Sequence, residues 1–167
     1  MESKFIVACV SAIRNVFTTM LKTEVTFGKP HIKQVGAPSN GVSGIIGFTG
    51  AVRGSIIVCF PLDVASTLMH RFAGAELPPD HPDFADAIGE LVNMVAGGTK
   101  TQINQPDVAI GCPSVIIGKE HQVFQRKDEA VVVVPCTCSA GVFTVEVALK
   151  PQISSLVAPK DTTAKVA

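Results

Sequence analysis

The sequence contains no tryptophan and no tyrosine, and its formal net charge is zero because 14 lysines and arginines balance 14 aspartates and glutamates. A protein that binds nucleic acid usually needs surplus positive charge to neutralise phosphates, or aromatic side chains on which unpaired bases stack. The nine phenylalanines fall mostly within apolar segments, which indicates core positions. Nucleic acid is therefore not an expected partner.

Long hydrophobic runs are also missing, although the mean hydropathy is +0.38. A membrane-spanning helix needs about 20 consecutive apolar residues, and the longest clear run here is Ala130 to Val134. The segment from Lys4 to Lys22 has the pattern of an amphipathic helix rather than of a secretory signal. The five cysteines are odd in number and scattered, which does not suit a secreted disulfide framework. These features predict a cytoplasmic protein that does not insert into a membrane.

The usual motifs for metal and nucleotide binding are missing as well. Cys136 and Cys138 form a Cys-x-Cys pair that faces one side of a strand, with Cys112 as a conceivable neighbour, but structural zinc sites usually show Cys-x2-Cys spacing. None of the four histidines supports a zinc site by its interval, so buried, reduced core thiols are expected. No glycine-rich phosphate loop opens a helix. A cysteine and a histidine that meet only in the folded chain stay an open alternative, although no cysteine lies in a nucleophile motif.

Apolar residues recur at intervals of three and four in three segments, which predicts three helices. The first runs from Ser3, its candidate N-cap, to Leu21, and a short one spans Pro61 to Gly74. After the proline-rich linker from Ala75 to Pro82, a long helix follows with Asp83 as its cap. Short β-branched segments punctuated by glycine predict strands: Glu24 to Phe27, His31 to Val35, Gly44 to Gly50, Val52 to Phe60, Ser114 to Ile117, His121 to Gln125, Glu129 to Pro135 and Gly141 to Leu149.

The two halves of the chain share one order, a long helix followed by strands that include a glycine-turned hairpin. Such a helix-plus-strands repeat predicts an α+β fold in which long helices pack on one mostly antiparallel sheet. Residues 1–150 are expected to form a single domain, and residues 151–167 a weakly ordered tail.

The long central helix carries a polar stripe. Successive helical residues turn by about 100°, so the spacing of four, three and four places one line of residues on one side: Asp86, Glu90, Asn93 and Gly97. The adjacent pair Gly97 and Gly98 costs roughly 1 kcal/mol of helix stability per glycine relative to alanine. Close approach of another surface would explain the pair. The alternative is ordinary, since exposed Glu and Asn residues are usually only solvated and glycine pairs often serve helix packing.

The whole string from Asp86 to Lys100, DAIGELVNMVAGGTK, resembles the signature helix of the CheC/CheX/FliY family of chemotaxis phosphatases. The family pattern matches at Asp86, Glu90, Asn93 and Gly97. The first helix has no Glu placed three residues before an Asn, so a single site is implied. The chain thus resembles the CheX branch, whose members are homodimers with joined sheets, more than the two-site CheC branch. The resemblance implies a CheC-like α/β sandwich.

That resemblance also implies a reaction, the hydrolysis of the phospho-aspartate of a CheY-like response regulator in chemotaxis or two-component signalling. Asn93 would orient the attacking water, and Glu90 would contact a cation of the regulator. Gly97 would let the regulator approach the helix backbone, with Asp86 and Lys100 as rim contacts. Mg²⁺ would come from the regulator, with no cofactor bound by this chain. The alternative is a non-catalytic docking or dimerisation module that binds a regulator or a signalling assembly.

Overall fold

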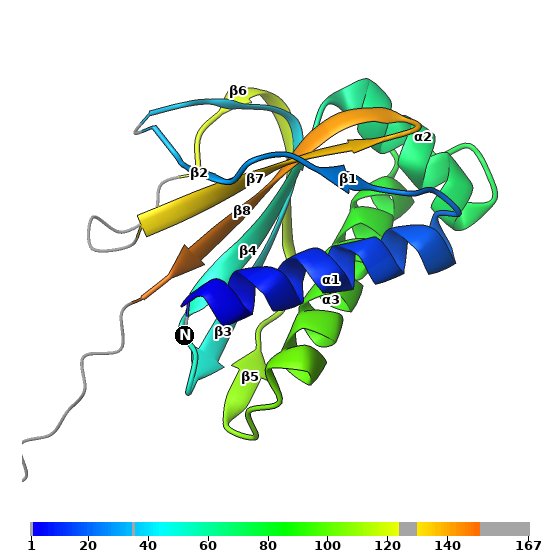
Figure 1. Cartoon of the computed structure of the whole chain (residues 1–167). Coiled ribbons are helices and arrows are strands. Elements are labelled where there is room, and N and C mark those ends of the chain that lie inside the picture. Colours follow the sequence, from blue (N-terminus) through cyan, green and yellow to red (C-terminus); the bar gives the residue numbers. More distant parts are fainter. Residues whose placement is uncertain (1, 35, 124–129, 151–167) are drawn as a thin grey trace, which may run out of the picture.

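The computed structural model describes residues 2–34, 36–123 and 130–150 of the chain, which form three helices and eight strands (Figure 1). The helices are α1 (Glu2–Met20), α2 (Leu62–Ala73) and α3 (Pro82–Ile103). All three predicted helices are therefore confirmed. The tail predicted for 151–167 lies outside the described residues. Within the described ranges, no helix is long and apolar enough to cross a membrane.

Both predicted N-caps were wrong. Ser3 lies inside α1, which is already helical at Glu2. The N-cap of α3 is His81 rather than Asp83, and its Nδ1 accepts a hydrogen bond from the Asp83 amide at 3.2 Å. Pro82 at the first helical position lacks an N–H and has its φ fixed near the helical value, so the helix starts there and Asp83 falls in its first turn. At the other end, Asn104 closes α3 in the left-handed conformation, with φ 47°.

The strands form one eight-stranded sheet in the order β1-β7-β8-β4-β3-β5, with β2 also paired to β7 and β6 to β3. Every pairing is antiparallel, as predicted for most of the sheet. The strands are β1 (Thr26–Phe27), β2 (His31–Ile32), β3 (Ser39–Gly50), β4 (Gly54–Phe60), β5 (Val108–Ile110), β6 (Ser114–His121), β7 (Ala130–Cys138) and β8 (Gly141–Leu149).

β1, β2 and β4 are shorter than predicted, since residues 24–25, 33–34 and 52–53 are not in strands, and β7 continues to Cys138 rather than Pro135. Three other strands differ more. β3 starts at Ser39 rather than Gly44, because Gly41 adopts φ 97° and the strand continues through a shift in register. β6 continues from Ser114 through Gly118 to His121, where a strand ending at Ile117 was predicted. Of the second predicted strand, 121–125, only His121 belongs to β6, and residues 122–123 are not in a strand. β5 was not predicted, and its three residues pair only with the end of β3. The predicted strands at 121–125 and 129–135 partly fall at 124–129, outside the described residues.

The strand order is the one that an internal repeat predicts. Exchanging the strand sets of the two halves, β1 with β5, β7 with β3 and β8 with β4, turns the order of the sheet into itself. The two central strands, β4 and β8, come one from each half and pair along their length. Under this exchange α1 takes the place of α3, and these two helices cross each other on the same face of the sheet (Figure 1).

The main core lies between this face and the helices. Six of the eight described phenylalanines are buried, which confirms their prediction as core residues. The Phe5 ring of α1 packs edge-on against Phe48 of β3 at 5.1 Å, and Phe17 stacks on Phe143 of β8 at 4.9 Å between ring centroids. The helix with the predicted polar stripe, α3, is anchored in the same core through Phe84, Ile88, Leu91, Val92 and Val95.

The opposite face of the sheet holds a buried polar network. Lys33 pairs with Glu146 of β8, and the Cys59 thiol lies 3.9 Å from the same carboxylate. The Ser43 hydroxyl donates to Cys59 Sγ at 3.4 Å and lies 2.7 Å from His121 Nε2. Because successive strand residues face opposite sides, this network is separated from the helices by the thickness of the sheet.

Candidate functional site

The polar stripe predicted on the long helix lies on the solvent side of α3. Asp86, Glu90 and Asn93 are exposed and Gly97 is half-buried. Of the apolar residues between them, Ala87 and Met94 are half-buried and the others are buried. Asp86, Glu90 and Asn93 make no side-chain hydrogen bond or ion pair with any other described residue. A carboxylate and an amide one helical turn apart therefore face solvent with their hydrogen-bonding groups available.

Those groups have complementary chemistry. The Glu90 carboxylate only accepts hydrogen bonds and is suited to a cationic partner. The Asn93 amide accepts through its oxygen and donates through its nitrogen, so it can hold a water molecule in one orientation without itself titrating. The pair can thus bind a cation and place a water molecule, provided that a partner supplies the reacting group.

The position of α3 is set by contacts on three sides. Beneath it, Gly44 of β3 faces Ile88 and Val92. On one flank, Pro113 and Val115 lie next to Gly89. On the other flank, Ala12 of α1 packs beside Gly98. A helix held in this way presents its exposed side chains on a rigid support, which precise positioning requires.

The two neighbouring glycines, Gly97 and Gly98, have different surroundings. A Cβ on Gly98 would lie 3.0 Å from the Ala12 Cβ, so close packing of α1 and α3 explains this glycine. A Cβ on Gly97 would meet no atom of the described chain within 4 Å. Packing within the chain therefore does not require glycine at 97. That Gly97 allows another molecule to approach the helix stays a prediction.

Lys100 stands somewhat apart from the stripe. It is half-buried in the last turn of α3, and its carbonyl accepts the capping hydrogen bond from the Asn104 amide at 3.2 Å. A cation in the last turn of a helix interacts favourably with the helix dipole. Lys100 thus has a structural role in addition to the partner contact predicted for it.

The cysteines offer a weaker site. Cys9, Cys59 and Cys136 are buried, and burial raises their thiol pKa, to about 12 for Cys9 and Cys136. Thiols held protonated in this way are poor nucleophiles and metal ligands. Cys138 is half-buried against the core, whereas Cys112 is exposed, so the prediction that the cysteines are core residues was wrong for Cys112. Within the described ranges, no group of three or more His, Cys, Asp or Glu side chains is arranged to hold a metal ion.

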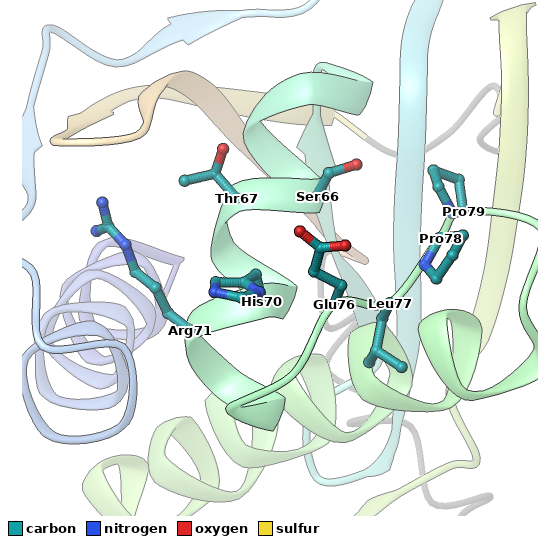
Figure 2. A pocket seen from close by; sticks show the side chains of 8 residues that line it. All are labelled: Ser66, Thr67, His70, Arg71, Glu76, Leu77, Pro78 and Pro79. Carbon is teal, nitrogen blue, oxygen red and sulfur yellow. The ribbon is translucent and has the colours of Figure 1, made fainter.

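Sequence patterns did not predict a hollow of about 430 Å³ between the outer side of α2 and the linker that follows it (Figure 2). Its polar groups are largely engaged. The hydroxyls of Ser66 and Thr67 donate to carbonyls of their own helix at 2.9 Å, and Arg71 donates to Ser139 Oγ at 2.8 Å. The side chains of His70 and Glu76 make no hydrogen bond or ion pair with another described residue. It is lined by Ser66, Thr67, His70, Arg71, Glu76, Leu77, Pro78 and Pro79.

Comparison with known proteins identifies related chains. The family model described as Chemotaxis phosphatase CheX matches residues 42–137, which is 96 of the 167 residues and includes all of α3. The CheY-P phosphatase CheX of Thermotoga maritima is 27% identical over 127 residues, covering 74% of this chain and 81% of that protein. These matches confirm the resemblance predicted from the string between Asp86 and Lys100.

Solved structures share the fold. The chemotaxis protein CheX from Desulfovibrio desulfuricans superposes with a TM-score of 0.80 at 29% identity, covering 87% of this chain and 99% of that one. A chain of the CheX–CheY–BeF3–Mg²⁺ complex from Borrelia burgdorferi superposes with a TM-score of 0.73 at 24% identity, covering 88% and 98%. At 24% identity, this second likeness establishes the fold alone. The CheC-like α+β architecture predicted from the sequence is thereby confirmed.

Proposed function

The chain belongs to the CheX family of chemotaxis phosphatases, and from that membership we propose that it hydrolyses the phospho-aspartate of a CheY-like response regulator. The observation that supports this most directly is the pair Glu90 and Asn93, exposed one turn apart on α3 with no side-chain hydrogen bond or ion pair to the rest of the described chain. The phosphatase name of the Thermotoga relative agrees with the reaction.

In the proposed reaction, water attacks the phosphorus of the acyl phosphate, the bond from phosphorus to the aspartate oxygen breaks, and the products are inorganic phosphate and the free carboxylate. The phosphoryl oxygens would be held by the regulator's own lysine and Mg²⁺, so the missing part is a correctly placed water. The Borrelia complex contains CheY and Mg²⁺ together with a CheX, which agrees with a metal ion supplied from the regulator's side. No step needs a metal held by this chain.

Asn93 is the proposed catalytic residue. Its amide oxygen accepts a hydrogen bond from the water and its nitrogen donates one, which aligns the water oxygen with the bond that breaks. Because the amide does not ionise, this role needs no proton transfer to the chain. Holding the water in place lowers the entropic part of the barrier.

Glu90 would make a charge-assisted contact with a cation on the regulator, most simply the lysine beside the phosphoryl group. One helical turn separates it from Asn93, so the contact would fix the regulator's phosphoryl group relative to the bound water. Gly97 lets the regulator surface approach the helix backbone. Asp86 and Lys100 would contribute charged contacts at the rim, which affect orientation and association rate more than chemistry.

A homodimer with joined sheets stays a prediction. The edges of the sheet are β1 with β2 on one side and β5 with β6 on the other. An exposed edge strand has unpaired backbone groups that a second copy can bind. Sedimentation of the purified chain at several concentrations tests this prediction.

The decisive measurement is the decay of a phosphorylated receiver domain from the same source, with Mg²⁺, in the presence of substoichiometric chain. The proposal expects multiple turnovers by the unaltered chain, loss of acceleration in Asn93→Ala, and weaker binding as well as slower turnover in Glu90→Ala. Gln102→Ala removes another exposed side-chain amide from the same helix and serves as the matched control, with unchanged decay expected.

Binding is measured separately with a beryllium fluoride-loaded receiver, which is not hydrolysed. Full acceleration by Asn93→Ala would exclude its catalytic role. Binding of the loaded receiver without any acceleration by the unaltered chain would favour the non-catalytic docking module. Neither binding nor acceleration would contradict the proposed function altogether.

A further inference from the structure

The contact beneath the Glu90–Asn93 turn is made by a residue without a side chain. Gly44 is buried in β3, and it pairs with Val58 of β4 on one side and with Val115 of β6 on the other. A Cβ built on Gly44 would overlap Val92 Cγ2, and would lie 3.2 Å from Ile88 Cγ2 and 3.5 Å from Val92 Cβ. Val92 therefore occupies the space in which any other residue at position 44 would place its side chain.

Neither side of this contact can yield easily. Gly44 lies in the interior of the sheet, between two paired strands, so its backbone is held from both directions. Val92 is fully buried, and a valine in a helix strongly prefers one side-chain rotamer, so it cannot turn its methyl group away without strain. Because carbon atoms pack at about 3.5–4.0 Å, a methyl group at position 44 would have to push this turn of α3 outward by on the order of 1 Å.

The turn that would move is the one that carries the proposed site. Asn93 directly follows Val92, and Glu90 lies on the outer side of the turn between Ile88 and Val92. On its flanks, the helix is held by Pro113 beside Gly89 and by Ala12 beside Gly98. An outward push at Val92 would therefore tilt or lift Asn93 relative to surfaces that stay in place.

We infer that Gly44 is a positioning residue, whose lack of a side chain sets the depth of α3 on the sheet and thereby the height of the Asn93 amide above the surface that receives the regulator. The inference rests on the proposed function. A regulator that docks on the whole surface presents its phosphoryl group at a fixed height, so a displaced Asn93 would hold the water out of line. Displacements of about 1 Å at a reacting centre can cost about 100-fold in rate.

The test compares Gly44→Ala, Val92→Ala and the double variant. We expect Gly44→Ala to lower kcat for receiver dephosphorylation by about 10- to 100-fold, with KM changed less than about 3-fold, because docking uses the wider surface. In the double variant the overlap with Val92 Cγ2 is gone, and the Cβ of residue 92 lies at the ordinary contact distance of 3.5 Å. The contact of 3.2 Å with Ile88 Cγ2 remains, which a small shift of the Ile88 side chain relieves. The double variant should therefore recover kcat to within about 3-fold of the unaltered chain.

Gly89→Ala is the matched control. It adds a methyl group to α3 itself, yet its Cβ would meet Pro113 and Val115 only at 3.6–3.9 Å, an ordinary contact. Both its kcat and its KM should stay within about 2-fold of the unaltered values. Urea unfolding of each variant identifies conditions in which every one is folded, so a loss of stability cannot be mistaken for a loss of kcat. If Gly44→Ala does not fold, Val92→Ile replaces it in the test, because the added methylene crowds the same contact from the side of the helix.

A second readout does not depend on catalysis. The NMR shifts of the Asn93 backbone and side-chain amides should move in Gly44→Ala and stay in Gly89→Ala. In the double variant they should match those of Val92→Ala, which has the same residue next to Asn93. If the unaltered chain lacks phosphatase activity, the proposed function fails and these shifts alone decide the inference. Unmoved Asn93 shifts, full kcat in a folded Gly44→Ala, or a double variant that regains stability without regaining kcat would each overturn it.

Discussion

Replacing Lys33 with methionine should destabilise the chain, because it leaves a buried carboxylate without its cation. Lys33 Nζ lies 2.7 Å from Glu146 Oε1 and 2.8 Å from Oε2, with side-chain exposures of 14% and 5%. Among the described residues, the carboxylate would keep only the weak contact from the Cys59 thiol at 3.9 Å in this variant. Breaking a buried pair from one side typically costs about 3–5 kcal/mol. The partial exposure of Lys33 places the expected loss near the lower end, at about 3 kcal/mol.

The double variant Lys33→Met with Glu146→Met separates the cost of a lone charge from the worth of the pair. Apolar side chains of similar size remove both charges, so the double variant should unfold within about 1 kcal/mol of the unaltered chain. Glu146→Gln should cost less than Lys33→Met, because the flexible lysine stem can turn its ammonium group toward solvent.

Urea unfolding followed by far-UV circular dichroism measures all of these variants, since the chain has no tryptophan to report by fluorescence. Receiver dephosphorylation should stay unchanged in each folded variant, because the pair lies on the face of the sheet opposite α3. A loss below about 0.5 kcal/mol in Lys33→Met would refute the reasoning, since it would mean that Glu146 is solvated or neutral without its partner. A double variant as unstable as the sum of its parts would refute it equally.

Two further predictions follow from burial and open space. Gly97→Ala should stabilise the chain by up to about 1 kcal/mol in urea unfolding, because nothing in the described chain obstructs its Cβ. The same variant should bind the beryllium fluoride-loaded receiver more weakly. Unchanged binding would mean that Gly97 is not part of the docking surface. Burial raises the pKa of Cys9 and Cys136 from 9.0 to about 12, so between these values the unfolded chain has lost thiol protons that the folded chain keeps. The free energy of unfolding should therefore fall by about 1.4 kcal/mol per pH unit for each thiol between about pH 9 and 12. The slope should be shallower in Cys9→Ala with Cys136→Ala, and equal slopes would contradict the burial argument.

Local patterns in the sequence were sufficient to predict the helices, most strands and the exposed stripe. The apolar spacing of α3 determines which side of the helix is buried, so the exposure of Glu90 and Asn93 follows from the sequence once the helix is known. The caps were harder to predict. Asp83 is a good cap residue in general, but Pro82 starts α3 with His81 as its N-cap, two residues before Asp83; Ser3 is likewise a good cap residue, but α1 is already helical at Glu2. β5 could not be predicted, because three residues carry no periodicity and their strand character depends on the end of β3.

Sequence patterns could not predict contacts between distant segments. Lys33 and Glu146 are separated by 113 positions, and each in isolation reads as an ordinary surface charge. The fit of Val92 over Gly44 likewise exists only once α3 lies on β3. In the sequence, Gly44 is one of several glycines in a predicted strand. Only the folded chain shows that Val92 fills the space where a side chain at position 44 would lie.

The symmetry of the strand order raises the question of why only one of the two equivalent helices carries the proposed site. The order of the sheet maps onto itself when the halves are exchanged, so α1 and α3 occupy equivalent places and β7 takes the place of β3. The strands themselves are not equivalent. β3 contains Gly41, Gly44, Gly47 and Gly50, whereas β7 contains no glycine between Ala130 and Cys138. On the other helix, α1, the exposed positions include Val7, Arg14 and Asn15, with no Glu three residues before an Asn. The helix with the Glu and Asn pair is thus the one that lies over a glycine-bearing strand, which is the arrangement expected if the depth of the helix matters to its chemistry.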